Sequence, residues 1–245
     1  VEPTSQTITI AVENNEIIFY YTKRTDLEYT VNYLESLEET ENVLAESKVV
    51  TGQTYMSEVT ENAIEIPGYV ALDPTTQYII IDVDGNVINF YYTKRTDLEY
   101  TVNYLEEGSN QVLAEAKVVT GQRYLDKIVE NAIDIEGYDM VEPISQEIII
   151  DVDENVINFY YTKRTDLEYT VNYLEQGTEE VLAESKVVTD QTYKSSVTEE
   201  AIEIEGYTKV EPTSQTIEID VDGNVINFYY TKRTDLEYTV KYLEL

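Results

Sequence analysis

The sequence predicts a β-rich α+β protein made of tandem repeats, each ordered strand, strand, short helix, strand, strand, and arranged end to end as an extended rod. One stretch, Phe19 to Val31, returns unchanged from Phe90, from Phe159 and from Phe228. Such self-similarity at a regular period indicates a repeat architecture. Apolar and polar residues alternate around these copies, which is typical of half-buried strands.

The borders of the repeats follow from these copies. Complete repeats are expected at 28–98, 99–167 and 168–236. Residues 1–27 are expected to be the C-terminal half of a repeat, and residues 237–245 the first strand of a further one. Because the chain starts and stops inside a repeat, we expect it to be a piece of a longer protein whose targeting and anchoring signals lie outside it.

Residues 1–27 are expected to contain a hairpin, with strands at Thr7–Val12 and Ile17–Tyr21. Two later copies carry Asp-Gly-Asn at its tip, at Asp84 and Asp222, and this sequence favours a tight turn. Alternation predicts two faces for the hairpin. The inward residues are Ile8, Ile10, Val12, Ile17, Phe19 and Tyr21, and the outward ones are Thr9, Ile18 and Tyr20.

The first complete repeat shows the expected order of elements. Strands are predicted at Tyr29–Tyr33, Val43–Tyr55, Tyr78–Val83 and Val87–Thr93. Ser57 can cap a short helix that runs through Ala63, because Val59 and Ala63 then share one helical face. Pro67 would end that helix. The polar loop Ser36–Asn42 is longer than its counterparts in the other repeats, so we expect it to be exposed.

Composition excludes several classes of function. The 245 residues carry 49 acidic and 16 basic side chains, a formal charge of -33. Such a chain repels phosphate backbones and anionic membranes, so no nucleic-acid partner and no membrane insertion are expected in this fragment. Cysteine and histidine are absent, which removes disulfides, thiolate ligands and the commonest general base. No enzyme and no cofactor are expected, with weakly bound calcium as the one candidate.

The connector between repeats, Thr93–Leu98, contains no glycine, proline or serine, so it is expected to be stiff. Its charged residues are either a salt-bridged clamp that fixes the angle between repeats or a solvated turn with marginal ion pairs. The joint residues in the four copies are Lys23, Arg24, Asp26, Lys94, Arg95, Asp97, Lys163, Arg164, Asp166, Lys232, Arg233 and Asp235. Small repeats bury little surface alone, so neighbouring repeats of the same chain are expected partners.

The hairpin tip resembles the start of a calcium loop, because aspartates alternate there with valine. A full loop of that kind needs a glutamate where Thr93 stands, so a plain hairpin turn is the favoured interpretation. The weak calcium candidates are Asp82, Asp84, Asp151, Asp153, Asp220 and Asp222.

Tyrosines that point away from the predicted core are candidates for stacking against a sugar ring. They are Tyr20, Tyr91, Tyr160 and Tyr229. Packing across the sheet or against the next repeat is the competing and favoured interpretation, because tyrosine is a common strand residue.

The ordered set of segments in each repeat resembles the MucBP repeat over essentially the whole chain. In the second repeat the matching residues are Tyr100–Tyr104, Lys117–Gln122, Gly137-Tyr138, Pro143 and Phe159–Tyr161. The resemblance implies a ubiquitin-like β-grasp fold and an extracellular place on Gram-positive bacteria, often in wall-anchored stalks, with mucin as a partner of some relatives. It supplies no catalytic residue. The third repeat departs from its sisters at Asp190, where Gly52 and Gly121 stand, and aspartate tolerates a left-handed turn.

The favoured function is a structural stalk of a bacterial cell-surface adhesin or surface fibre that projects a functional tip from the cell wall. The alternative is a module that binds mucin or another glycan repeat by repeat. Lateral self-assembly through exposed strand edges is a variant of the stalk hypothesis. A lysine-to-asparagine crosslink, which wall-anchored adhesins can contain, would join Lys117 to Asn103 in the second repeat.

Overall fold

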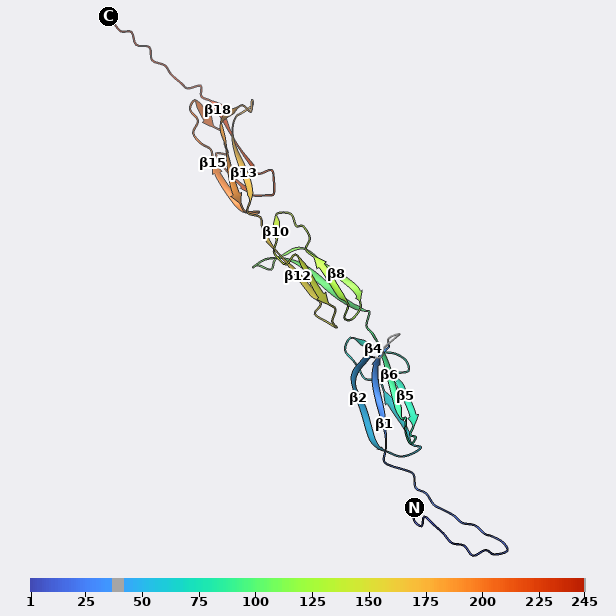
Figure 1. The fold of residues 1–245 in the computed structure, drawn as a ribbon. Coiled ribbons are helices and arrows are strands. Elements are labelled where there is room, and N and C mark those ends of the chain that lie inside the picture. Colours follow the sequence, from blue (N-terminus) through green and yellow to red (C-terminus); the bar gives the residue numbers. More distant parts are fainter. Residues whose placement is uncertain (37–41, 245) are drawn as a thin grey trace. The chain divides into compact units, whose positions relative to one another are not determined.

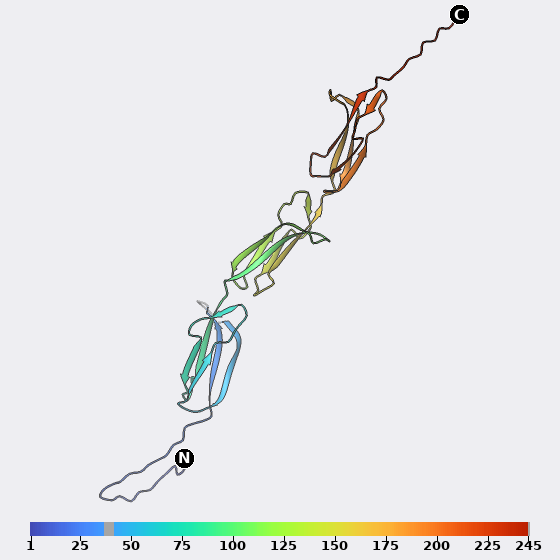
Figure 2. The ribbon, with the colours of Figure 1, turned by 180° about the vertical axis from the view of Figure 1, so that it is seen from behind.

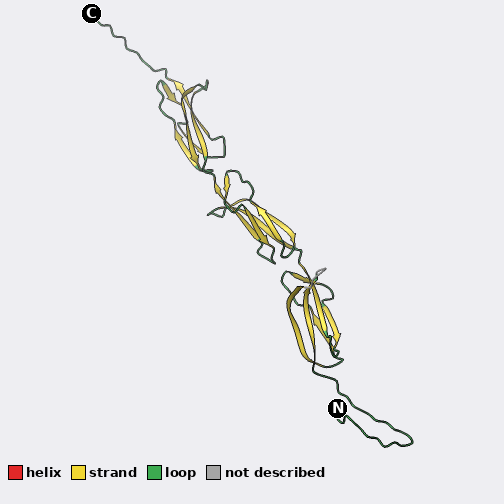
Figure 3. Ribbon diagram, viewed as in Figure 1, coloured by secondary structure: helices red, strands yellow, loops and turns green. Residues whose placement is uncertain are grey.

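The computed structural model describes residues 1–36 and 42–244, and the described part of the chain is all-β (Figures 1 and 3). Three consecutive groups of six strands are here called modules 1, 2 and 3. Module 1 contains β1 (Leu27–Glu35), β2 (Asn42–Gln53), β3 (Glu58–Asn62), β4 (Tyr69–Ala71), β5 (Thr76–Ile80) and β6 (Val87–Lys94). Module 2 contains β7 (Leu98–Glu106), β8 (Val112–Gln122), β9 (Lys127–Asn131), β10 (Tyr138–Met140), β11 (Ser145–Ile149) and β12 (Val156–Lys163). Module 3 contains β13 (Leu167–Glu175), β14 (Val181–Gln191), β15 (Ser196–Glu200), β16 (Tyr207–Lys209), β17 (Ser214–Glu218) and β18 (Val225–Lys232).

Each module pairs a four-stranded sheet with a two-stranded one. In module 1 the sheet order is β2-β1-β6-β4, and the small sheet is β3-β5. The first and last strands, β1 and β6, are parallel neighbours, while β2 and β4 pair antiparallel at the edges. Module 3 repeats this order as β14-β13-β18-β16 with β15-β17, and module 2 has the corresponding pairs.

The prediction of a short helix is wrong, and so is the predicted strand-strand-helix β-grasp arrangement. Within the described residues its place is taken by β3, in which Val59 lies opposite Ile79 of β5. The Ser57 hydroxyl does not cap a helix; it donates to the Thr54 carbonyl oxygen (2.7 Å) and closes a turn. Val59 and Ala63 are four residues apart, which fits a helical period and also the period of two of a strand. Pairing with β5 from Glu58↔Ile80 to Asn62↔Thr76 makes this segment a strand.

The core of each module lies between the two sheets. In module 1 the alternate residues of β1 and β6 point into it, and the Tyr33 and Phe90 rings stack with centroids 6.3 Å apart. The core side chains include Tyr29, Val31, Tyr33, Ile81, Ile88, Phe90 and Tyr92. The period of two in the sequence therefore identifies the buried face of both central strands.

The incomplete copies at the two ends form no strands in the described chain. Residues 1–26 fold back on themselves in both views (Figures 1 and 2), with Gln6 Nε2 donating to the Ile18 carbonyl oxygen (2.7 Å). The predicted inward face is wrong here, because Val12 is 99% and Tyr21 86% exposed. Residues 237–244, which lie in a predicted strand, form no strand either, and Tyr242 is 94% exposed. No strand of the described residues pairs with either segment.

The described chain divides into two compact units. One consists of Val1–Tyr100, Val119–Lys127 and Ile149–Asn155, and the other of Thr101–Val118, Ile128–Ile148 and Val156–Leu245. These borders cut through module 2, so the repeat borders expected from the sequence stay a prediction. The loop Ser36–Asn42 lies almost wholly outside the described residues. No helix in the described part is long and apolar enough to span a membrane.

Candidate functional site

The connector between modules 1 and 2 is hydrogen-bonded on both sides. The Arg95 amide N–H donates to the Gly68 carbonyl oxygen of module 1 (2.9 Å), and the Tyr124 amide N–H of module 2 donates to the Arg95 carbonyl oxygen (2.9 Å). All three residues belong to one compact unit. The next connector repeats this arrangement within the other unit. There Arg164 bonds to Gly137 (3.0 Å) and Tyr193 bonds to Arg164 (2.9 Å).

A tyrosine ring closes each of these joints over a buried glycine. Gly68 has a φ of +78°, and a Cβ added to it would lie only 2.4 Å from carbons of the Tyr124 ring. The Tyr69 ring meets Tyr124 edge-on, with centroids 5.5 Å apart and planes at 74°. Glycine is needed here for the left-handed backbone and again for the close approach of the ring. We call this set of contacts the joint.

The second joint has the same geometry, and module 3 provides a natural comparison. Gly137 has a φ of +79° and lies under Tyr193, whose ring is 5.5 Å from that of Tyr138. Gly206 has nearly the same backbone, with a φ of +82°, but nothing lies within 4 Å of an added Cβ. Accordingly Gly206 is half-buried, whereas Gly68 and Gly137 are buried.

The arginines and aspartates expected at the joint pair within the connector. Arg95 donates from Nε and Nη2 to the two carboxylate oxygens of Asp97, each at 2.9 Å. This hydrogen bonding holds the pKa of Asp97 below its ordinary value. The same forked pair recurs as Arg24–Asp26, Arg164–Asp166 and Arg233–Asp235. Each pair spans two residues and its carboxylate is exposed, so it shapes the connector and contributes little energy.

Three of the four lysines expected at the joint, Lys94, Lys163 and Lys232, lie at the ends of the last strands. Lys232 Nζ is 2.9 Å from Glu175 Oε1, and Lys163 Nζ is 3.7 Å from Glu106 Oε1. Both pairs join the last strand of a module to the first strand of the same module. Lys94 is half-buried at the end of β6, and Lys23 is exposed. The described ion pairs of these lysines therefore connect two strands of one module and do not cross the connector.

The predicted hairpin is wrong, because β5 pairs with β3 while β6 pairs with β1 and β4. The loop that connects β5 to β6, here called the tip, is closed by an asparagine that the sequence indicated only as a turn residue. Asn86 Oδ1 accepts from the Asp82 amide (2.8 Å), and Asn86 Nδ2 donates to the carbonyl oxygens of Asp82 (2.9 Å) and Glu28 (3.0 Å). Asn155 and Asn224 make the same three bonds in modules 2 and 3. The tip is thereby tied to the start of the module's first strand.

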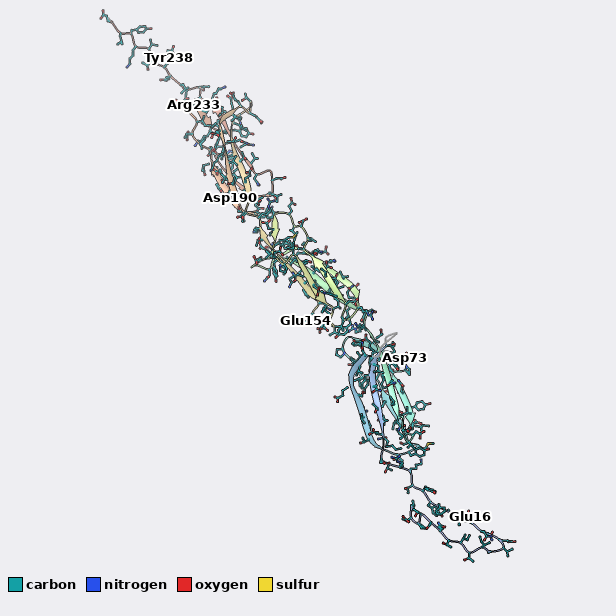
Figure 4. The ribbon with its side chains drawn as sticks, in the orientation of Figure 1. Glu16, Asp73, Glu154, Asp190, Arg233 and Tyr238 are labelled. Carbon is teal, nitrogen blue, oxygen red and sulfur yellow. The ribbon has the colours of Figure 1, made fainter. Side chains whose placement is uncertain are left out.

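The calcium candidates sit in this tip. One carboxylate oxygen of Asp82 accepts from the Val83 amide (2.7 Å). In the part of the chain that the structure describes, no group of three or more Asp, Glu, His or Cys side chains could hold a metal ion. Figure 4 shows Glu154, a residue of the equivalent tip in module 2, projecting outward. Calcium binding at these aspartates stays a prediction.

A pocket of about 630 Å³ adjoins the first joint. Its lining includes Ile64, Pro67 and Arg95 together with Val152 of the module 2 tip, all within one compact unit. The buried Tyr92 hydroxyl donates to the Ile64 carbonyl oxygen (2.9 Å) and accepts from the Ile64 amide (3.1 Å). A core tyrosine thus holds the loop that carries Gly68.

The outward tyrosines lie on the open face of the sheet beside a row of polar side chains. Tyr91 is 36% exposed, and Tyr160 37%. On the same face, Asn32 Nδ2 donates to Asn89 Oδ1 (2.8 Å) and the Ser47 hydroxyl donates to Asn32 Oδ1 (2.8 Å). Tyr229 is half-buried, and Tyr20, in the strandless segment, is 71% exposed. An aromatic ring beside amides is suited to a sugar, but this use stays a prediction.

A tyrosine, a glutamate and a lysine form a polar cluster that the sequence analysis missed. Glu61 on β3 accepts from the Tyr29 hydroxyl (2.5 Å) and from Lys48 Nζ (2.7 Å). Burial and the Glu61 carboxylate raise the pKa of Tyr29 to about 12. Burial acts to raise the pKa of Glu61, but the bonds from Lys48 and Tyr29 outweigh it and lower that pKa. Module 3 has the equivalent cluster of Tyr169, Glu199 and Lys186.

The contacts of Lys117 and Asn103 in module 2 bear on the predicted crosslink. Lys117 Nζ binds Glu130 Oε1 (2.6 Å), while Asn103 Nδ2 donates to Asn158 Oδ1 (2.9 Å). Lys117 is therefore engaged toward β9 and Asn103 toward β12, in separate contacts.

Comparisons with known proteins give bacterial relatives. No protein-family model matches the sequence. Two curated relatives, both internalin J from strains of Listeria monocytogenes, are 25% identical over 250 and 253 residues, each match covering 96% of this chain. The chain spans about a quarter of the length of these relatives, 26% and 28%.

Solved structures include the Bacillus anthracis TIE protein, with 11% identity, 85% of this chain and 51% of that chain covered, and a TM-score of 0.35. They also include the type 2 repeat of the mucus binding protein MUB from Lactobacillus reuteri, with 14% identity, coverage of 56% and 100%, and a TM-score of 0.21. These likenesses do not assign the chain to a family, and the resemblance to MucBP stays a prediction.

Proposed function

We propose that the chain is part of a non-enzymatic, extracellular stalk of a bacterial cell-surface adhesin or surface fibre, which projects a functional tip from the cell wall. The observation that carries the proposal is the joint. A flexible linker leaves its backbone to water, but Arg95 and Arg164 are each bonded to the module before and the module after. A tyrosine ring then packs over the glycine of each joint.

The proposal includes the repeat borders expected from the sequence, 28–98, 99–167 and 168–236, with neighbouring repeats as the main partners. It also includes anchoring through sequence outside this fragment. A formal charge of -33 keeps such chains apart in solution. The edge strand β2 has three register shifts against β1 and carries Lys48 at its middle, features that protect an edge from pairing with another chain. Lateral assembly would therefore need cations to screen the charge.

Distances between spin labels test the joint. The sequence has no cysteine, so Glu46→Cys in module 1 and Glu115→Cys in module 2 give two unique and exposed labelling sites. We expect a narrow distance distribution that broadens in Tyr124→Ala. Tyr55→Ala is the matched control, because Tyr55 is the equivalent residue of module 1 and packs on its own core. A distribution that is already broad in the unmodified chain would refute a fixed joint.

Glycan binding is the second candidate, favoured by the open face with Tyr160 beside the paired Asn103 and Asn158. Binding of mucin glycans by each module would make affinity rise steeply with the number of modules. We would measure binding to immobilised mucin for the chain and for Tyr160→Ala. Loss of binding in the variant supports this candidate, and equal binding removes it.

A further inference from the structure

The order of strands determines how a module takes up tension along the chain. The chain enters module 3 at the start of β13 and leaves it at the end of β18. These two strands are parallel neighbours, paired in register from Thr170↔Val225 to Glu175↔Tyr230. The entry and exit points therefore lie at opposite ends of one shared seam. A pull on the two ends slides β13 and β18 past each other, and the backbone bonds of the seam are loaded together rather than one after another.

Side-chain contacts cross the same seam in addition to its backbone ladder. The Asn172 side chain donates to Asn227 Oδ1 (2.9 Å) across it, and Asn224 Nδ2 donates to the Glu168 carbonyl oxygen (3.1 Å) near its start. Lys232 pairs with Glu175 (2.9 Å) near its far end.

The core also crosses this seam. The Tyr173 and Phe228 rings stack with centroids 6.4 Å apart and planes at 15°. Sliding the strands would break that stack as well as the ladder. The seam of module 1 has the same features, with Asn32–Asn89, Asn86–Glu28 and the Tyr33–Phe90 stack. The same connections therefore recur in modules 1 and 3, at the pair of strands that a pull on the chain would load.

We propose that each module is a force-bearing unit, in which the parallel seam between its first and last strands resists tension along the chain by shear. The two edge strands and the β15-β17 sheet lie outside this load path. This inference goes beyond a stalk, which needs length and fixed joints but no resistance to pulling. It concerns a single module, so it stands or fails independently of the joint.

Single-molecule pulling on the full chain with engineered cysteine handles tests the inference. The pair Glu168→Cys and Thr231→Cys grips opposite ends of the seam, so it loads the seam in shear. The pair Glu168→Cys and Val225→Cys grips the same end, so it unzips the same bonds one at a time. All three sites are exposed. Forced unfolding reports the barrier to unfolding, so we expect an unfolding force about twofold or more higher in shear.

Full extension of module 3 in the shear geometry should add roughly 200 Å of length, at 3.3–3.6 Å per residue less the folded span. Equal forces in the two geometries would overturn the proposal. A second pair of variants checks the load path without new handles.

In the shear geometry, Asn172→Ala with Asn227→Ala removes a bond across the seam, whereas Thr198→Ala removes the Thr198–Thr216 hydroxyl bond (2.8 Å) in β15-β17. Only the first should lower the unfolding force. An equal loss of force in both variants would also overturn the proposal.

Discussion

Gly137 and Gly206 offer a matched test of the joint, because the two positions differ in one respect. Both glycines have a left-handed backbone, with φ of +79° and +82°, and each is followed by a tyrosine. Only Gly137 lies against the ring of the following module, that of Tyr193. Replacement by alanine therefore brings the same backbone strain at both sites and an added collision at one.

The cost of each replacement follows from this geometry. An alanine held in the left-handed region costs roughly 1–2 kcal/mol at either site. At Gly137 the new methyl group would lie only 2.4 Å from a carbon of the Tyr193 ring, so the ring must move. It would then lose its edge contact with Tyr138, of a kind worth about 0.5–1.5 kcal/mol. The bond from the Tyr193 amide to Arg164 is worth about 1 kcal/mol more if it opens. Since about 1.4 kcal/mol is a tenfold change in an equilibrium, the joint should open readily.

Two measurements separate these costs. Thermal unfolding should show a loss of stability in both Gly137→Ala and Gly206→Ala, because both carry the backbone strain. Spin labels at Glu115→Cys in module 2 and Glu184→Cys in module 3 report on the second joint. Their distance distribution should broaden in Gly137→Ala and stay unchanged in Gly206→Ala. Equal distributions in the two variants, together with equal losses of stability, would refute the role assigned to the ring over the glycine.

Three further predictions concern single side chains. Tyr161→Phe removes the hydroxyl that bonds to Ile133 but keeps the buried ring, so the second joint should loosen, by spin-label distances, with a loss of stability of about 1–3 kcal/mol because the Ile133 N–H and C=O lose their partner. Glu199 has a lowered pKa, so its stabilising effect is present above the ordinary glutamate pKa of about 4.3 and is lost as pH falls below it; acid titration of Lys186→Met should show a smaller loss over that range. Asn224→Ala should lower the thermal midpoint of module 3 by removing three hydrogen bonds, and a midpoint unchanged by this replacement would contradict the proposed closure of the tip.

The strands that could be predicted are those whose pattern is visible locally. Ile88, Phe90 and Tyr92 alternate with outward residues in β6, and all three are buried. The helix predicted from Ser57 does not form. Its apolar residues Val59 and Ala63 fit both the period of a helix and the period of two of a strand. The choice between them rested on β5, a strand well downstream in the sequence. The same pattern gave no strand at either end of the chain, where no strand of the described residues pairs with the segments of Tyr21 and Tyr242.

The joint, too, could be predicted only in part, because it depends on residues far apart in the sequence. Its place in the sequence was predicted, but the charged side chains that drew attention pair two residues apart within the connector. Gly68 directly follows Pro67, the residue expected to end the helix, and no local pattern points to Tyr124. The signal that could have found them is the pairing of a Gly-Tyr in each repeat with a tyrosine in the next. That pairing cannot be recognised without knowing which loops of consecutive repeats meet.

The sequence alone determined that this protein is a series of acidic repeats with alternating strands, because repetition, charge and a period of two are local properties of the chain. Only the tertiary structure decided that a strand replaces the helix, that a tyrosine ring covers a glycine at each joint, and that the first and last strands of a module are parallel neighbours. These features depend on contacts between residues far apart in the chain, and such contacts leave no periodic trace in the sequence.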